Sequence, residues 1–347
     1  MIFSLKRQRA LHPRLIFQNV PVTIVTRHKH VGLWFESNLS WHFHINEIYL
    51  KTQNRLNLLK TYKYKVSRST LEKMYFAFIR PIIEYADIVW AGANSNDLVK
   101  LDRLQVEAMR IVTVATKRSN ILNLYKELNW MYLSDRQNCH SLIMMYKIVN
   151  KLTPPYLTNL IPPTVGDGHD YNLRNRSNFT IPFCKTLLFQ RSFIPRTLHL
   201  WNNLDAKLTK CTTLSSFKKT LHKSYCPSNY RSKLRQKLFN SGKRYWNCIH
   251  ARLRLGCSKL NKHLFRNLHV IDSEKCICGN PCESVYHYFF ECPLFVESRV
   301  ELFSSLSHIT ALDLDLFLHG KHELSHDQNC YLFSQIQKYL KNTRRFD

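Results

Sequence analysis

The stretch CICGNPCESVYHYFFEC, residues 276–292, is the part of the sequence that most restricts how the chain can fold. Cys276 and Cys278 stand one residue apart, His287 follows after eight intervening residues, and Cys292 follows after four more. Thiolates and imidazole are ligands that tetrahedral zinc prefers, and a glycine after the second cysteine eases the tight turn of a Cys-x-Cys knuckle. We therefore expect these four side chains to hold one structural zinc ion in a small zinc-finger-like module.

Two alternatives stay open for this stretch. Cys282 could replace Cys276 or Cys278 as a ligand, or remain a free thiol. The four residues could also be unrelated, because the chain contains 11 Cys and 17 His. The odd number of cysteines, and the lack of an apolar segment behind Lys6 and Arg7, favour a reducing compartment. We therefore expect an intracellular protein, nuclear or cytoplasmic, whose cysteines are buried thiols or metal ligands instead of disulfides.

The charge balance indicates an anionic partner. The 347 residues include 51 Lys and Arg against 24 Asp and Glu, which gives a formal net charge of +27. The excess is concentrated between Tyr171 and Ile271, where 21 residues are Lys or Arg and Asp205 is the only acidic residue. Aromatic residues interleave with these cations, and this composition suits RNA or single-stranded DNA, whose phosphates pair with cations and whose bases stack on rings. The competing interpretations are a solvated basic face and aromatic residues that belong to the core.

We expect a defined set of cations in this window to bind RNA and DNA. The set is Arg174, Arg176, Arg191, Arg196, Lys218, Lys219, Arg231, Lys233, Arg235, Lys237, Lys243, Arg244, Arg252 and Arg254. No apolar run reaches the ~18 residues of a membrane-spanning helix, so we expect no membrane partner. The sequence does not indicate protein partners.

Hydrophobic periodicity predicts a mainly helical chain with a short N-terminal β segment. Ser69, followed by Glu72, is a capping-box signal for the start of a helix, and Pro81 is expected to end or kink that helix. The residues between Pro154 and Tyr171 are rich in Pro and Gly and predict a linker. The predicted strands are 15–17, 22–26, 31–35 and 183–188, and the predicted helices are 43–64, 69–81, 98–111, 134–151, 192–204, 215–225 and 232–255.

Signals of catalysis are weak in this sequence. The two close Asp pairs are not bracketed by strand signals, so we expect them in solvated loops or in the tail instead of in a two-metal site for phosphoryl transfer. These pairs are Asp167 with Asp170 and Asp313 with Asp315. His42 and His44 could ligate a metal, but a helix face explains them equally well. The sequence has 8 Gly and contains neither a Gly-rich phosphate loop nor a Gly-x-Ser-x-Gly elbow.

Several short runs follow one another in an order that resembles one known family. Over about residues 1–300 the chain resembles the part that follows the palm in the reverse transcriptases of jockey-type non-LTR retrotransposons. The stretch 276–292 looks like the Cys-Cys-His-Cys finger region of such elements. The matching runs are VGLWF (31–35), LSWHFHI (39–45), YFAFIRPIIEY (75–85), VW (89–90), LQxxAxRI (104–111, where x is any residue), LNW (128–130), YNLR (171–174), SFIP (192–195), LWNNL (200–204) and LRLG (253–256).

The composition and the resemblance together indicate how the chain is divided. The expected segments are a palm-edge β segment (1–42), a helical thumb-like bundle (43–153), a linker (154–170), a basic helical connector that binds nucleic acid (171–271), the zinc-finger-like module (272–300) and a C-terminal tail (301–347). For the family, the resemblance implies RNA-directed DNA polymerase activity, with template, primer and element RNA as partners.

One element of that family does not occur in these 347 residues. Such polymerases carry two metal-binding aspartates in an Ala-Asp-Asp turn of the palm, and the sequence contains no such turn. Without these carboxylates Mg²⁺ has no ligands, so we expect Mg²⁺ only in a parent polymerase with an intact palm, and no polymerase activity from residues 1–347 alone. The resemblance therefore implies a C-terminal fragment of a retrotransposon polymerase, which we expect to bind template and primer. The alternatives are a stand-alone zinc-stabilised RNA- or DNA-binding or interaction protein derived from a transposon, and a translated relic without a selected function.

Overall fold

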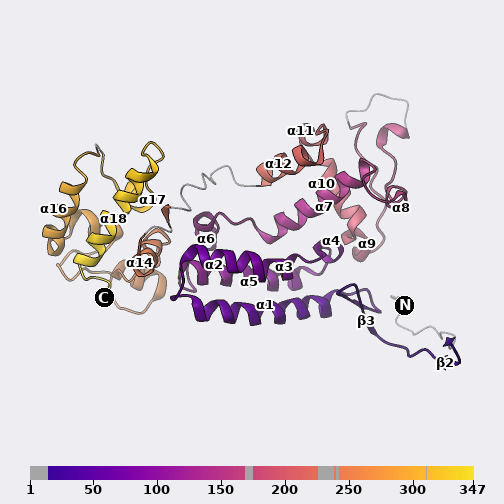
Figure 1. Ribbon diagram of the computed structural model, residues 1–347, viewed down its shortest axis with the longest axis horizontal. Helices are drawn as coiled ribbons and strands as arrows, with labels where there is room; N and C mark the ends of the chain where they lie inside the picture. The colour runs from indigo at the N-terminus through magenta and orange to yellow at the C-terminus, as the bar shows by residue number, and fades with distance from the viewer. Residues whose placement is uncertain (1–14, 169–174, 226–237, 240–241, 310) are drawn as a thin grey trace. The chain divides into compact units, whose positions relative to one another are not determined.

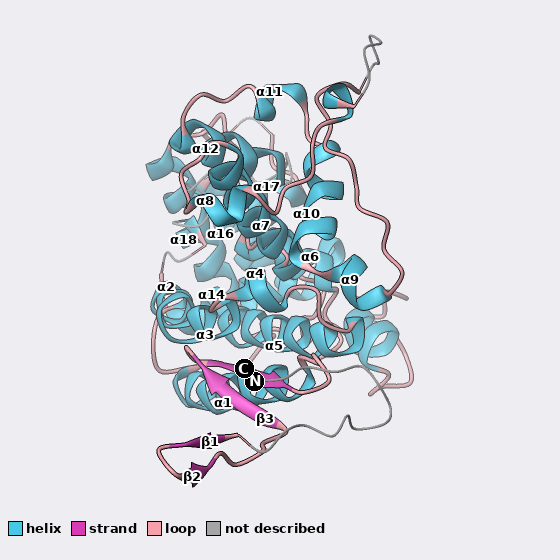
Figure 2. Ribbon diagram, turned by 90° about the vertical axis from the view of Figure 1, so that its right-hand side faces the viewer, coloured by secondary structure: helices cyan, strands magenta, loops and turns pink. Residues whose placement is uncertain are grey.

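Helices dominate the computed structural model, which describes residues 15–168, 175–225, 238–239, 242–309 and 311–347 (Figure 1, Figure 2). The strands within these ranges are short and lie near the N-terminus, so the expectation of a mainly helical chain with a short N-terminal β segment is confirmed. The chain forms two compact units that alternate along the sequence. Unit 1 comprises residues 1–54, 80–104 and 131–227, and unit 2 comprises residues 55–79, 105–130 and 228–347.

The β segment of unit 1 consists of two separate antiparallel hairpins. They pair β1 (Ile16–Phe17) with β2 (Val20–Pro21), and β3 (Arg27–His30) with β4 (Leu33–Glu36). The predicted strand at 22–26 is wrong, because the strand is formed by the basic residues that follow it. Val31 and Gly32, with φ of 45° and 81°, make the two-residue turn that joins those residues to β4.

The helices of unit 1 are mostly short. They are α3 (Arg80–Glu84), α4 (Asp87–Trp90), α7 (Leu133–Val149), α8 (Pro155–Thr158), η2 (Val165–Asp167), α9 (Leu187–Arg191), α10 (Phe193–Asn202), α11 (Ala206–Thr209) and α12 (Leu214–Tyr225). Two longer helices, α1 (His42–Tyr62) and α5 (Ser95–Thr113), contribute residues to both units.

The core of unit 1 forms where α7 packs against α10 and α12. Tyr146 of α7 stacks on Phe217 of α12 with ring centroids 4.4 Å apart, and Trp201 of α10 contacts the same ring at 5.9 Å. Helices from both sides of the predicted linker therefore share one core. The division of the chain at 154–170 stays a prediction.

Capping contacts correct two local predictions. The hydroxyl of Ser67 accepts a hydrogen bond from the Thr70 N–H at 3.1 Å, so α2 (Arg68–Met74) begins two residues earlier than a cap at Ser69 would place it. Residues 183–188 do not form a strand, because Thr186 caps α9 by accepting a hydrogen bond from the backbone of the third helical residue.

Pro81 does not end the helix that α2 begins. The π-helical turn η1 (Tyr75–Ile79) follows α2 directly, and α3 continues the chain as far as Glu84. A π-helical turn alters which carbonyls are hydrogen-bonded, and it accommodates a residue that lacks a backbone N–H. The proline therefore marks an irregularity in the helix instead of its end.

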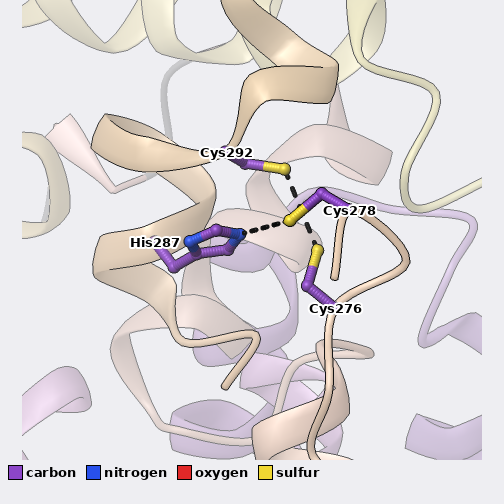
Figure 3. A group of neighbouring side chains, drawn as sticks. All are labelled: Cys276, Cys278, His287 and Cys292. Carbon is purple, nitrogen blue, oxygen red and sulfur yellow. Dashed lines mark hydrogen bonds between the residues drawn. The ribbon is translucent and has the colours of Figure 1, made fainter. Parts of the chain in front are cut away.

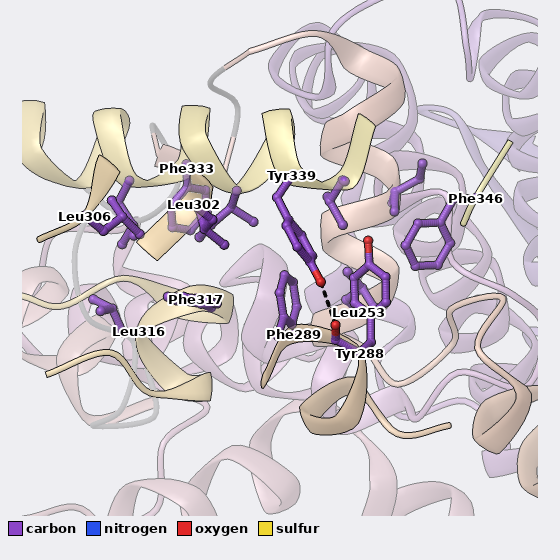
Figure 4. Packing of buried hydrophobic residues seen from close by; sticks show 14 of the residues in the cluster. Leu253, Tyr288, Phe289, Leu302, Leu306, Leu316, Phe317, Phe333, Tyr339 and Phe346 are labelled. Atoms are coloured by element: carbon purple, nitrogen blue, oxygen red, sulfur yellow. Dashed lines mark hydrogen bonds between the residues drawn. The ribbon is translucent and has the colours of Figure 1, made fainter. Parts of the chain in front are cut away.

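The segment expected as a tail is folded over residues 301–309 and 311–347 and builds much of the core of unit 2 (Figure 4). Phe317 and Tyr339 pack against Phe289, Phe333 belongs to the same core, and the Tyr339 hydroxyl donates a hydrogen bond to the Tyr288 carbonyl at 2.6 Å. The helices of unit 2 are α2, η1, α6 (Ile121–Leu128), α14 (Arg244–Arg254), α15 (Asn261–His263), η3 (Leu264–Leu268), η4 (His287–Glu291), η5 (Pro293–Phe295), α16 (Val296–Ser305), α17 (Leu314–His319) and α18 (His326–Asn342). No helix in the described part of the chain is both long and apolar enough to cross a membrane.

Candidate metal centre

The structure brings together the four side chains that the spacing of the Cys/His stretch singled out (Figure 3). One possible ligand atom from each of Cys276, Cys278, His287 and Cys292 lies within 4.8 Å of the others. Cys276 Sγ and Cys292 Sγ are 3.8 Å apart, and Cys278 Sγ is 3.3 Å from His287 Nε2. These four residues could therefore hold a metal ion.

The donor set and its distances suit a tetrahedral site. Two sulfurs bound at about 2.3 Å to one tetrahedral zinc ion lie about 3.8 Å apart, which is the separation between Cys276 and Cys292. Three thiols and one imidazole also form a soft ligand set that disfavours Mg²⁺ and Ca²⁺. Cys276, His287 and Cys292 are buried and Cys278 is partly exposed, so protein atoms surround most of the site, as is typical of structural metal centres.

Local backbone contacts place the ligands. In the knuckle, the Gly279 N–H donates to the Cys276 carbonyl at 3.0 Å, and Gly279 has a φ of 95° that other residues rarely adopt. His287 begins the π-helical turn η4, whose i to i+5 hydrogen bond joins the Cys292 N–H to the His287 carbonyl at 2.8 Å. This turn brings His287 and Cys292 to one side, while Tyr288 and Phe289 between them enter the core of unit 2.

A carboxylate lies behind the histidine. His287 Nδ1 is 3.3 Å from Glu291 Oε2, so Nε2 is the nitrogen directed at the thiols. Such carboxylate contacts orient metal-ligating imidazoles and select their tautomer.

The thiol environments differ within the group. The backbone N–H of Asn280 is the largest influence that lowers the pKa of Cys278, to about 7. Burial raises the pKa of Cys292 to about 12. A cation between the sulfurs would offset this penalty, because metal binding takes the thiolate form.

Cys282 is not one of the four grouped residues. Its thiol is 3.7 Å from a carboxylate oxygen of Glu274, and its N–H donates to Asn280 Oδ1 at 3.0 Å. Burial raises the pKa of the Cys282 thiol. In the structure, Cys276 and Cys278 therefore belong to the group that could hold a metal ion, and Cys282 lies beside that group.

The cations expected to bind nucleic acid differ in their exposure. Five lie outside the described residues, namely Arg174, Arg231, Lys233, Arg235 and Lys237. Those exposed to solvent are Arg176, Arg191, Lys218, Lys219 and Lys243. The partly buried ones include Arg196, whose Nη2 donates to Ser141 Oγ at 2.9 Å, and Arg244 and Arg252 of α14, which donate to backbone carbonyls.

Arg254 does not face solvent as the sequence suggested. Its side chain is 2% exposed, and its Nη2 and Nε lie 2.8 and 3.1 Å from the two carboxylate oxygens of Glu127. Arg68 Nη1 approaches the same carboxylate at 2.6 Å, and the Arg254 guanidinium lies 3.9 Å from the ring centroid of Phe239. Burial alone would raise the pKa of Glu127, but Arg254 and Arg68 lower it to about 2.

The sequence did not predict this buried Arg68–Glu127–Arg254 group. A signal was present, because Glu127 lies between the buried Leu124 and Leu128 on the apolar face of α6. A carboxylate on such a face requires a buried cation, and the sequence contains too many Arg residues to identify which ones supply it.

Most of the remaining described candidates have structural contacts. Asp167 and Asp313 accept backbone hydrogen bonds at the starts of η2 and α17. Asp315 is an exposed residue of α17, and Asp170 lies outside the described residues. His42 Nδ1 is 2.9 Å from Asp97, and His44 Nδ1 accepts the Trp34 N–H at 3.4 Å. The helix-face interpretation of these histidines therefore accounts for their contacts.

Aromatic residues of the basic window are divided in the same way. Trp201, Phe217 and Phe239 are buried, whereas Phe189 and Tyr245 are exposed. Core packing therefore accounts for the first three rings, and the last two are accessible from solvent.

Comparison of the chain with models of protein families, with curated proteins and with solved structures gives no match.

Proposed function

We propose that this chain binds single-stranded nucleic acid through its basic residues, and that Cys276, Cys278, His287 and Cys292 hold a structural zinc ion in unit 2. We further propose that it acts as the C-terminal, primer- and template-holding part of a reverse transcriptase of a jockey-type non-LTR retrotransposon. The convergence of the four ligands carries the zinc assignment. The ordered sequence runs and the basic window support the nucleic-acid role.

The charge distribution favours an anionic partner of extended form. Lys218 and Lys219 are exposed on α12, and Arg191 is exposed at the end of α9. Asp205, the only acid between 171 and 271, is engaged as the N-cap of α11 and accepts a hydrogen bond from Lys207 N. The phosphate backbone of RNA or single-stranded DNA supplies the regularly spaced negative charges that such a surface requires.

Metal content tests the zinc assignment. We expect one zinc ion per chain by mass spectrometry of the purified protein, and loss of that ion in Cys276→Ser. Cys282→Ser is the matched control, because its thiol belongs to the same segment but not to the ligand group. Loss of zinc in the control, or its retention in Cys276→Ser, would contradict the ligand assignment.

Fluorescence anisotropy with labelled 20-nucleotide single-stranded RNA and DNA tests the binding. The logarithm of the affinity should fall linearly with the logarithm of the salt concentration, with a slope of about −0.7 for each phosphate contacted. Lys218→Gln with Lys219→Gln should reduce the slope more than the control pair Lys126→Gln with Lys341→Gln, which removes two exposed charges outside the basic window. Binding that does not depend on salt, or no binding, would refute the proposal.

A further inference from the structure

Unit 2 contains a cavity of about 150 Å³ beside α14. Its lining combines cationic and aromatic residues with apolar or small ones, namely Tyr64, Val114, Arg244, Tyr245, Cys248, Ile249, Arg252, Ser258, Lys259 and Phe346. Pockets for drug-sized molecules measure about 300–1,000 Å³, so this cavity has room for one small group such as a phosphate.

Backbone carbonyls hold the two arginines in place. Arg244 Nη2 donates to the Lys63 carbonyl at 3.2 Å and to the Val112 carbonyl at 2.9 Å. Arg252 Nε donates to the Val114 carbonyl at 2.9 Å. These neutral acceptors orient the guanidinium groups and do not neutralise their positive charges.

The cavity is therefore a site of excess positive charge. Among the described residues, no carboxylate lies within ion-pair distance of Arg244, Arg252 or Lys259, and Lys259 Nζ contacts only a backbone carbonyl, that of Phe346, at 3.3 Å. The buried Nε of Arg244 has no hydrogen-bond partner in this part of the chain. Glu72, the carboxylate that influences Arg244, is paired with Arg68 at 3.0 Å.

Two aromatic side chains border the same cavity. Tyr64 is 66% exposed and Tyr245 is 52% exposed, and both contribute to its lining. The Tyr245 hydroxyl donates to the Phe346 carbonyl at 2.9 Å, which holds that ring in place. Exposed rings beside a cationic pocket are typical of sites that bind single strands, because bases next to a bound phosphate can stack on them.

We propose that this cavity binds one phosphodiester group of a single-stranded nucleic acid, with Arg252 and Lys259 as its cationic contacts and the rings of Tyr64 and Tyr245 as platforms for the adjoining bases. This inference rests on the proposed nucleic-acid function and assigns to it a site in unit 2. Cys248 at the cavity wall is 6% exposed and supplies a position at which the cavity can be filled.

The test uses the full chain and a labelled 20-nucleotide single-stranded DNA. Arg252→Gln with Lys259→Gln should lower the salt slope by about 0.7, the contribution of one lost phosphate contact. The control pair Lys126→Gln with Lys341→Gln removes the same charge elsewhere in unit 2 and should leave the slope nearly unchanged. Equal losses in both pairs would show a general charge effect and overturn the assignment.

A second variant keeps the charge and reduces the space. Cys248→Met narrows the cavity. It should lower the salt slope of oligonucleotide binding by about as much as the Arg252/Lys259 pair does, and the thermal unfolding midpoint checks that the variant is folded. If Cys248→Met and the Arg252/Lys259 pair both bind the oligonucleotide as the wild type does, the cavity is not a phosphodiester site. If the wild-type chain binds no oligonucleotide, the proposed function itself is refuted.

Competition separates the sources of phosphate. Inorganic phosphate should displace the oligonucleotide only at millimolar or higher concentration, because one small anion cannot use the two rings. Displacement at micromolar concentration would identify a site for free anions and overturn the assignment to a phosphodiester.

Discussion

The two units differ in what holds their interiors together. In unit 1, the contact of α7 with α10 and α12 is made mainly by apolar and aromatic side chains such as Tyr146 and Phe217, with one polar contact from Arg196 to Ser141. Unit 2 also has a large aromatic core, but two polar groups are built into it, the Cys/His group and the buried Arg68–Glu127–Arg254 group. Helical periodicity describes most of the first core, whereas the second depends more on directional contacts that need every partner in place.

The largest expected effect is the loss of metal from unit 2. Structural zinc in small finger peptides contributes about 10–16 kcal/mol, which is comparable to the whole stability of a typical domain. Chelation or Cys292→Ser should therefore abolish the protection of α18 against hydrogen exchange, while α7 in unit 1 keeps its protection. Exchange measured by mass spectrometry on peptides from both helices checks this. Equal loss of exchange protection in both helices would mean that the two cores unfold together.

Removing the buried carboxylate should have the next largest effect. Glu127→Gln leaves Arg254 buried without a counter-charge and leaves Arg68 with Glu72 as its remaining carboxylate partner. The change should cost about 3–5 kcal/mol of unfolding free energy. Glu107→Gln is the matched control, because its partner Lys60 is 48% exposed and such surface pairs contribute at most about 1 kcal/mol. Urea unfolding of both variants gives the two values, and similar losses would contradict the importance of burial.

The same carboxylate predicts a dependence on pH. The pKa of Glu127 falls from 4.5 to about 2 on folding, so its ionised form stabilises unit 2 fully above about pH 4.5. That contribution is lost as the pH falls from 4.5 toward 2. The difference in stability between the wild type and Glu127→Gln should therefore shrink over this interval, and a difference that stays constant would disagree with a lowered pKa.

A conservative change in the core of unit 1 should cost less. Phe217→Leu keeps an apolar side chain but removes the stack on Tyr146, and it should cost about 1–2 kcal/mol. Urea unfolding measures the loss, and hydrogen exchange should show it in α7 and not in α18. If Phe217→Leu lost more unfolding free energy than Glu127→Gln, the buried ion pairs of unit 2 would matter less than the aromatic stack of unit 1, contrary to our expectation.

The smallest effect tests the corrected helix start. Ser67→Ala removes the hydroxyl that accepts the Thr70 N–H and should cost about 1 kcal/mol. Ser69→Ala, two residues further on, should cost clearly less. If thermal or urea unfolding showed a larger loss of stability for Ser69→Ala than for Ser67→Ala, Ser69 would be the N-cap.

Local sequence patterns predicted much of the fold. The helices that became α1, α5, α7, α10 and α12 were expected within a few residues of their observed ends, because apolar side chains recur along each of them at helical spacing. The errors occurred where local signals competed. Ser67 and Ser69 are both acceptable caps. The turn at Val31 and Gly32 pairs residues 27–30 with β4, so the strand forms there and not at 22–26.

The candidate metal centre could be read from the sequence because its ligands lie within 17 residues, and the knuckle and the π-helical turn that orient them are local. The core into which the segment 301–347 packs could not be predicted in this way. Their apolar side chains needed Tyr288 and Phe289 to pack against, and no local pattern states which segments will share a core.

The sequence by itself determined the helical character of the chain, its excess of positive charge and the four-residue Cys/His group, because periodicity, composition and short-range spacing are properties of the chain alone. Only the tertiary structure decided which cations are available to a ligand. Arg252 and Arg254 lie two residues apart on α14, yet Arg252 lines the cavity while Arg254 is buried against Glu127, a partner 127 residues away. The free energy of a buried ion pair depends on the approach of distant segments, and that approach follows from the packing of the whole unit.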